Sequence, residues 1–200
     1  GVVASPPGRA VLGSIREAVG VERAQPALFS LPAPGRLLVQ SSSGPWVVGA
    51  DGSKRRLGEW REASWSPFGR YVVAAGQNEL AALELDGDVR WSLARARVRL
   101  PRWGGTQADT RIAYLAGSRL HVVAGDGTGD VDAGGLPAAA PVAPAWRPGL
   151  PFLVAYADTR GRVYAYEPEA GALRRRSAPI PGVRRLEWSS DGALLLALGR

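Results

Sequence analysis

A tryptophan that returns at nearly constant intervals constrains the fold of this chain more than any other feature. Trp65 recurs as Trp103, Trp146 and Trp188, at spacings of 38, 43 and 42 residues. A turn rich in Gly or Pro follows each Trp, and a short apolar run follows each turn. Such regular spacing indicates a chain built from repeats of about forty residues.

The second half of the unit repeats as well. Short β-prone runs lead to a hairpin signal at Asp51-Gly52, Asp86-Gly87 and Asp126-Gly127, and to Ala170-Gly171 in the fourth unit. Each unit then holds about four strands, and no window in these units shows the 3.6-residue periodicity of a helix. We therefore predict an all-β chain, a β-propeller of four-stranded antiparallel blades.

The motif W-S-P-x-G followed by an apolar strand and a later D-G resembles the WD-repeat-like propeller repeat of the TolB family, whose members are periplasmic. Residues 65–69 and 188–192 carry the closest matches, Trp103 is followed by an insertion, and the turn after Trp146 is shifted. The resemblance covers residues 29–200. It implies a propeller fold and leaves the function open, because similar repeats also occur in the propellers of some prolyl-oligopeptidase-type peptidases.

The repeats predict one propeller after a short extension. Residues 1–28 form the extension, with a short helix expected over 9–20, because Val11, Leu12, Ile15 and Val19 share one face. The blades are predicted at residues 29–60, 63–97, 100–138, 143–180 and 184–200.

The last blade is expected to be incomplete, with about four and a half blades in an open or partial ring. Its two apolar strands have no outer partner in the sequence, and a bare strand edge attracts pairing partners. Either further chain or another molecule, including a second copy, is expected to cover the edge. Further chain is the interpretation that we favour.

Composition says little about partners. The formal charge of +7 comes almost wholly from Arg, Lys54 being the only Lys, which resembles the codon bias of a GC-rich genome and is weak evidence for nucleic acid. The chain has no Met and starts at Gly1. We therefore expect a removed signal peptide or a membrane tether upstream of Gly1, and an extracytoplasmic location.

The sequence offers few residues for catalysis or metal binding. Cys is absent and His121 is the only His, so zinc and copper sites and a Ser-His-Asp triad are not expected. The carboxylates of Asp126, Asp130 and Asp132 are close in sequence, but their spacing is not that of a calcium loop, and we interpret them as a turn. We expect no cofactor and no enzymatic activity.

Two further patterns have structural interpretations. The runs 54–56 and 174–176 are basic, yet they fall on the outermost strands of different blades and indicate a solvated rim rather than a nucleic-acid site. The repeated Trp residues are expected to pack between blades. Trp46, Trp60 and Trp91 fall outside the repeat and are predicted to be freer to serve a surface.

The leading hypothesis is a non-catalytic module that binds a protein through loops at one end of the blades. One alternative is a propeller accompanying a peptidase-type domain outside this chain, and another is an enzyme acting within the propeller channel, for which we see no polar cluster. The candidate binding residues lie in loops that enter the repeat strands and in mid-unit loops: Arg61, Glu62, Gln77, Asn78, Arg99, Arg102, Asp158, Arg160, Arg184 and Arg185.

Overall fold

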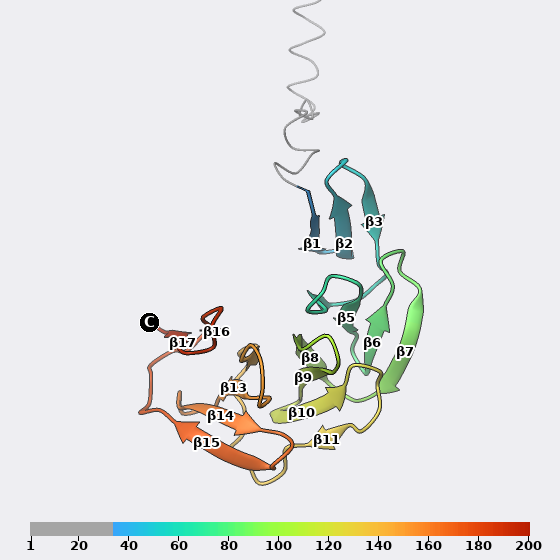
Figure 1. The fold of residues 1–200 in the computed structure, drawn as a ribbon. Coiled ribbons are helices and arrows are strands. Elements are labelled where there is room, and N and C mark those ends of the chain that lie inside the picture. Colours follow the sequence, from blue (N-terminus) through green and yellow to red (C-terminus); the bar gives the residue numbers. More distant parts are fainter. Residues whose placement is uncertain (1–33) are drawn as a thin grey trace, which may run out of the picture. The chain divides into compact units, whose positions relative to one another are not determined.

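The computed structural model describes residues 34–200, and these residues contain strands and turns but no helix (Figure 1). The predicted extension 1–28 with its helix at 9–20, and the start of the first predicted blade, lie outside the described residues. The described residues belong to two compact units, one with residues 34–36 and 49–53 and the other with residues 37–48 and 54–200. In the smaller unit, Asp51 Oδ1 accepts hydrogen bonds from the backbone N–H and the hydroxyl of Ser53 at 3.0 and 2.6 Å.

The strands form five antiparallel sheets in chain order. The first is β1 (Arg36–Ser41), β2 (Gly44–Gly49) and β3 (Lys54–Arg56). The second is β4 (Glu62–Trp65), β5 (Val72–Ala75), β6 (Glu79–Leu83) and β7 (Val89–Ala94). The third is β8 (Val98–Gly105), β9 (Thr110–Ala116), β10 (Arg119–Ala124) and β11 (Val131–Asp132). The fourth is β12 (Ala145–Trp146), β13 (Val154–Ala157), β14 (Val163–Glu167) and β15 (Ala172–Arg176), and the last is β16 (Arg185–Trp188) and β17 (Leu195–Leu198).

From the second sheet on, successive sheets meet through their first strands. Strand β8 contacts β4 on one side and β12 on the other, and β12 also contacts β16. Sheets that place their first strands side by side and pack face to face are propeller blades. The predicted all-β class and the partial β-propeller of four-stranded blades are therefore confirmed.

The Ser of the W-S-x-x-G motif closes the turn between the first two strands of a blade. In blade two, the Ser66 N–H donates to Tyr71 O and the Ser66 hydroxyl accepts from Tyr71 N–H, both at 2.9 Å. Ser189 makes the same pair of bonds with Leu194, again at 2.9 Å. Gly69 and Gly192, at φ 64° and 67°, supply the left-handed residue that this turn needs. The motif thus repeats because one hairpin repeats.

The repeated Trp residues pack between adjacent sheets, as predicted. Trp103 lies against a cluster with Val73 and Tyr114, and Trp146 against one with Leu115 and Tyr156. The indole N–H of Trp146 donates to Arg102 O at 2.9 Å, and that of Trp188 to Ala145 O at 3.1 Å. Each bond ends on the residue before the preceding repeat's Trp, so it ties one innermost strand to the next.

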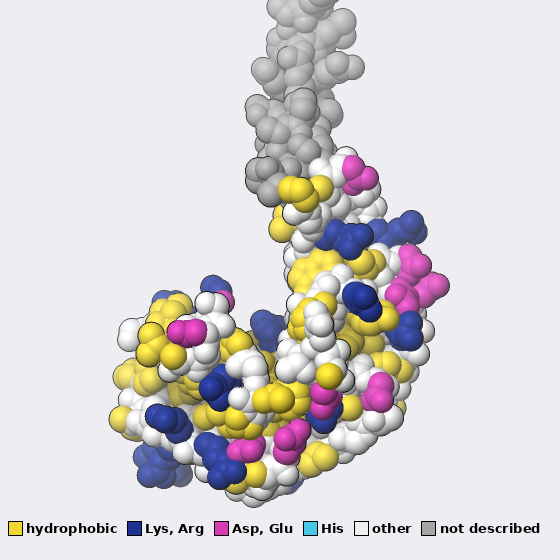
Figure 2. All heavy atoms as spheres, in the orientation of Figure 1, with side chains coloured by type: hydrophobic (Ala, Val, Ile, Leu, Met, Phe, Trp, Pro, Cys, Tyr) yellow, Lys and Arg dark blue, Asp and Glu magenta, His cyan; other side chains and the backbone are white. Residues whose placement is uncertain are grey.

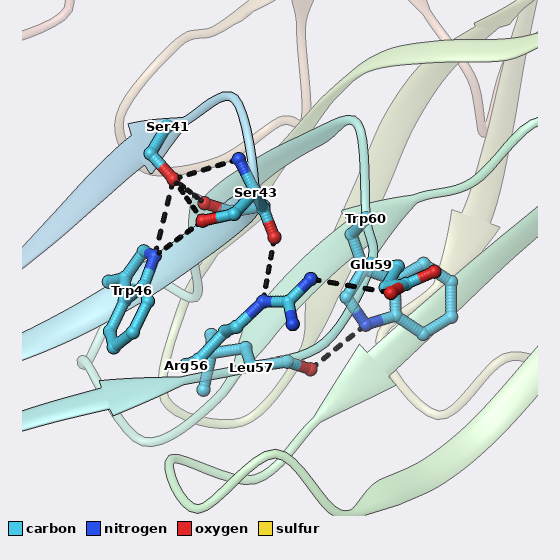
Figure 3. A network of polar contacts seen from close by, with 8 residues as sticks. Ser41, Ser43, Trp46, Arg56, Leu57, Glu59 and Trp60 are labelled. Atoms are coloured by element: carbon cyan, nitrogen blue, oxygen red, sulfur yellow. Dashed lines mark hydrogen bonds and ion pairs between the residues drawn. The ribbon is translucent and has the colours of Figure 1, made fainter.

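The expectation that Trp60 and Trp91 serve a surface is wrong, whereas for Trp46 it stays a prediction. Trp91 packs against the cluster between the second and third sheets, and its indole donates to Gly125 O at 3.0 Å. Trp60 packs on the cluster between the first two sheets and donates to Leu57 O at 3.1 Å (Figure 3). In the same view, Trp46 donates to Ser41 Oγ at 3.2 Å. The indoles of Trp60 and Trp91 have internal partners that repeat spacing cannot reveal.

The last sheet has two strands, and leucines are exposed on one face of β17 and directly before it: Leu194, Leu196 and Leu198 are 72%, 55% and 44% exposed. On the other face, Leu195 and Ala197 pack against the fourth sheet. None of the elements in residues 34–200 has the helical length and hydropathy that a membrane span requires.

Gly104 is expected to tolerate no side chain. A Cβ atom at this position would lie 2.3 Å from Cγ of Trp146, because the indole packs directly on the β8 backbone. Gly104→Ala should therefore lower the free energy of unfolding by about 1–2 kcal/mol. Urea denaturation measures this. Gly134→Ala is the control, since its Cβ would meet nothing nearer than Asp132 O at 3.9 Å; equal losses in both variants would contradict the packing argument.

Candidate functional site

Several of the predicted binding residues lie at one end of the second and third blades. In each antiparallel blade, the residue that begins the first strand lies beside the hairpin that joins the second strand to the third. Thus Glu62 of β4 pairs with Ala75, directly before the hairpin at residues 76–78. The two groups of loops that were predicted separately therefore share one end of the blade.

In the second and third blades these loops contact one another. The Arg61 guanidinium donates to Gln77 Oε1 at 3.1 Å, and that of Arg99 to Gly117 O at 2.6 Å. The Asn78 carbonyl accepts the Arg95 backbone N–H at 2.9 Å, which holds the loop between the blades against this hairpin. The side chains of Gln77 and Asn78 stay exposed.

The backbone that enters β8 is strained. Arg97 and Leu100 have φ of 56° and 54°, and they are the non-glycine residues with positive φ in the part of the chain that the structure describes. The Glu62 carboxylate accepts the Leu100 backbone N–H and so fixes this conformation. The pairing of β8 with β9 shifts register between Arg99 and Arg102, the segment that contains Leu100. Such left-handed residues cost free energy and cluster at functional sites.

Three charged side chains from three innermost strands influence one another. Burial lowers the pKa of the half-buried Arg102 guanidinium, the Glu62 carboxylate opposes this shift, and the Arg185 guanidinium adds to it. Among the described residues, the Arg102 guanidinium donates a single hydrogen bond, to Pro101 O at 2.8 Å. Arg185 pairs with Glu187 at 2.7 Å on the surface.

We call this group the arginine-rich end. It consists of charged residues in or directly before the first strands of the second, third and fifth sheets: Arg61, Glu62, Arg97, Arg99, Arg102 and Arg185.

Three predicted residues are not joined to this group by any contact. Asp158 is buried, 3% exposed, and its carboxylate accepts from the backbone N–H groups of Arg160 and Arg162 at 2.8 Å and from the Tyr164 hydroxyl at 3.1 Å. It builds its own turn. Arg160 and Arg184 are exposed and stay predictions.

The arrangement suits recognition of carboxylates. Guanidinium groups bind carboxylates with two parallel hydrogen bonds, and a partly buried guanidinium with unused donors gains most from such a ligand. Within residues 34–200, no group of three or more His, Cys, Asp and Glu side chains is placed to hold a metal ion.

Asp130 has a role that its spacing did not indicate. Its carboxylate binds the Arg95 guanidinium, accepts the Tyr114 hydroxyl at 2.7 Å, and lies 3.6 Å from Nδ1 of His121. Burial raises the pKa of the Tyr114 hydroxyl, and Asp130 raises it further. Because Arg95 follows the second blade and the other three belong to the third, this enclosed group joins two blades. Asp126 instead forms the predicted turn, accepting Thr128 N–H at 3.0 Å.

A cleft of about 890 Å³ opens at the opposite end of the second and third blades. Tyr71 and Trp103 stack there with ring centroids 6.2 Å apart, and the Arg90 guanidinium lies 5.0 Å from the Tyr71 ring centre. Arg90 also pairs with Glu84 at 2.7 Å, so its charge is already matched. Repeat spacing did not predict this cleft.

Comparisons with known proteins identify the fold. No protein-family model matches the chain, and no curated protein matches it. Among solved structures, 480 chains are similar, so the fold is a widely used one. One is the β-propeller domain of Cps50 (Swd1) from Myceliophteria thermophila, with a TM-score of 0.62 and 16% sequence identity. The match covers 82% of this chain and 59% of that domain, so the chain spans less than two thirds of the propeller it resembles. This likeness agrees with the predicted β-propeller fold.

Proposed function

We propose that this chain is a non-catalytic propeller module that binds an acidic segment of a partner protein at the arginine-rich end. The observation that carries the proposal is Arg102. Arg102 is half-buried, the charges of Glu62 and Arg185 act on its pKa in opposite directions, and all but one of its guanidinium donors lack a partner among the described residues. A carboxylate from a ligand would supply the missing hydrogen bonds.

The surrounding backbone supports this reading. Arg97 and Leu100 are held in left-handed conformations beside the same group, where strain positions side chains for binding. The Glu62 carboxylate already accepts the Leu100 N–H. Because Glu62 is the single carboxylate in a group of arginines, the net charge of the arginine-rich end stays positive. Propellers bind partners through loops at one end of a rigid scaffold, and protein interaction is a frequent use of such scaffolds.

Selection from a random twelve-residue peptide library is expected to enrich Asp and Glu. A selected acidic peptide should bind Arg102→Gln and Arg185→Gln at least tenfold more weakly than the unaltered chain, measured by fluorescence anisotropy. Added salt should weaken binding further, because the contacts are ionic.

Arg55→Gln is the matched control, since Arg55 is an exposed arginine on the outer strand β3. Binding to this variant should be unchanged. Selected peptides without an acidic bias, or equal binding to all three variants, would contradict the proposal.

The finer identification as a TolB-type repeat, with an extracytoplasmic location and a tether upstream of Gly1, belongs to the same proposal. It is supported by the W-S-P-x-G motif at residues 65–69 and its counterpart at 188–192. The peptidase-associated alternative draws on the same motif. Fractionation of cells that make the natural gene product, together with sequencing of the flanking gene, distinguishes them.

A further inference from the structure

A second site lies where the fourth blade meets the segment that links it to the third. A cleft of about 510 Å³ opens there, between linker residues 137–138 and the hairpin that joins β13 to β14. Three arginines line it: Arg160, Arg162 and Arg176. Asp158 is the one carboxylate among the described residues of the lining. Figure 2 shows Lys and Arg side chains gathered over β14 and β15.

The hairpin that carries two of these arginines is held in place by its own hydrogen bonds. The Asp158 carboxylate accepts the backbone N–H groups of Arg160 and Arg162, both at 2.8 Å. The Thr159 N–H donates to Ala138 O at 3.0 Å and fixes the hairpin to the linker. Because Asp158 is buried and binds backbone groups, it leaves the guanidinium groups unpaired. The cleft is therefore preformed and basic.

The register of the sheets shows which residues of the third blade correspond to these arginines. One row of side chains crosses each of these sheets, starting two residues after the partner of the repeated Trp. In the third sheet this row is Tyr114, His121 and Asp132. In the fourth sheet it is Tyr156, Tyr164 and Arg176. Arg176 therefore occupies the position that an aspartate occupies one blade earlier.

The residue two positions before the middle of the row lies on the same face of the sheet. In the third blade it is Arg119, whose guanidinium donates to Asp132 at 2.7 Å. In the fourth blade it is Arg162, and the residue that corresponds to the aspartate is Arg176. Two like charges thus replace an ion pair, which is unfavourable on neighbouring strands. An anion between them would remove the repulsion.

Both charges act on one hydroxyl group. Burial and the Asp158 carboxylate raise the pKa of the Tyr164 hydroxyl, and the charges of Arg162 and Arg176 oppose this rise. The two guanidinium groups therefore lie close to the same point in the cleft. In the part of the chain that the structure describes, neither they nor Arg160 have an ion-pair partner.

We propose that this cleft binds the phosphate group of a phosphate monoester. Three guanidinium groups and one carboxylate leave the lining with two net positive charges. A phosphate monoester carries about 1.5 to 2 negative charges at pH 7, whereas a carboxylate carries one. Guanidinium groups also bind phosphate oxygens through paired hydrogen bonds. The site shares no residue with the arginine-rich end.

The lining favours a monoester over the phosphodiester of a nucleic acid. Each phosphodiester carries a single negative charge, and single strands bind through aromatic rings on which bases stack. The ring that lines this cleft belongs to Tyr164, which is buried with its hydroxyl bound to Asp158 at 3.1 Å. It offers no face to a base.

The test measures binding of a five-residue phosphoserine peptide to the 200-residue chain by isothermal titration calorimetry. Arg162→Gln and Arg176→Gln should each weaken binding at least tenfold. Arg175→Gln is the matched control, since Arg175 is the exposed neighbour of Arg176 on β15 and does not line the cleft. Binding to this variant should be unchanged. Arg102→Gln, which tests the arginine-rich end, should also leave it unchanged.

Arg176→Asp tests the role of the like charges, because it restores the charge pattern of the third blade. Without phosphate, this variant should have a higher urea midpoint than the unaltered chain. Added inorganic phosphate should raise the midpoint of the unaltered chain and of Arg175→Gln by more than that of Arg176→Asp. Equal effects of phosphate on all three chains would overturn the proposal.

Further ligands identify the source of the phosphate. Tighter binding of the phosphopeptide than of glucose 6-phosphate assigns the group to a modified residue of a partner protein, and the reverse order assigns it to a small metabolite. Equal binding of a peptide with glutamate in place of phosphoserine, or absence of binding by every phosphate compound, would overturn the proposal. So would a twenty-residue oligothymidylate that binds more tightly than both monoesters and is released by Arg176→Gln.

Discussion

Replacing Trp146 with alanine is expected to lower the free energy of unfolding by about 3 kcal/mol. The indole packs on the cluster between the third and fourth sheets and meets the Phe152 ring edge-on, with centroids 6.1 Å apart. It also lies against Gly104 and donates to Arg102 O at 2.9 Å. Alanine removes the packing and the bond that tie β12 to β8. Urea denaturation followed by circular dichroism gives the midpoint and the slope.

Trp146→Phe separates the two contributions. The phenyl ring keeps most of the apolar contact and leaves Arg102 O without its donor, so its loss should be clearly smaller, about 1–2 kcal/mol. Arg175→Ala is the control on the exposed outer strand and should leave stability nearly unchanged. Similar small shifts in the urea midpoint for Trp146→Ala and Arg175→Ala would show that Trp146 does not hold the blades together.

The fold was predictable because each blade meets the same local requirements. Ser66 and Ser189 close the same hairpin with the same bonds, and Gly69 and Gly192 supply the same backbone conformation. These requirements fall within six residues, so they leave a periodic signal. The predicted helix at residues 9–20 and the blade boundaries stay predictions.

Apart from the repeated Trp residues, contacts between blades left no such signal. The Trp91 indole donates to Gly125 O, 34 residues away in the sequence, and the Arg95 guanidinium donates to Asp130, 35 residues away. Neither partner is marked by its neighbours in sequence, so Trp91 seemed free and Asp130 seemed part of a turn. Side chains that bridge blades depend on tertiary packing, which overrides local pattern.

The position of the candidate site on the blade could be predicted from the sequence, but the arrangement of its side chains and backbone could not. Strand topology was enough to place Arg61, Glu62 and Gln77 at one end of a blade. A register shift in β8 accompanies the burial of Arg102 and the left-handed backbone at Leu100. No residue type in the sequence indicates that shift. Asp158 shows the converse, since its loop position suggested exposure whereas its carboxylate is buried by its own turn.

Asp130→Ala is expected to lower the free energy of unfolding by about 2–3 kcal/mol. The carboxylate is 8% exposed and holds together the Arg95 guanidinium and the Tyr114 hydroxyl. Without it, the buried Tyr114 hydroxyl loses its acceptor, and Arg95 loses the ion pair that joins the second blade to the third. Because both partners bind the same carboxylate, their contributions should be coupled.

A double-mutant cycle with Tyr114→Phe measures that coupling. Once Asp130 is alanine, removing the hydroxyl should cost much less than it does in the unaltered chain, and the difference is the energy of the Tyr114–Asp130 bond. Asp126→Ala is the matched control, since this carboxylate lies in the same loop yet serves only its own turn with Thr128. If Asp126→Ala and Asp130→Ala destabilise equally, or if the cycle shows no coupling, then the loop holds the blades through its backbone and Asp130 is not the link between them.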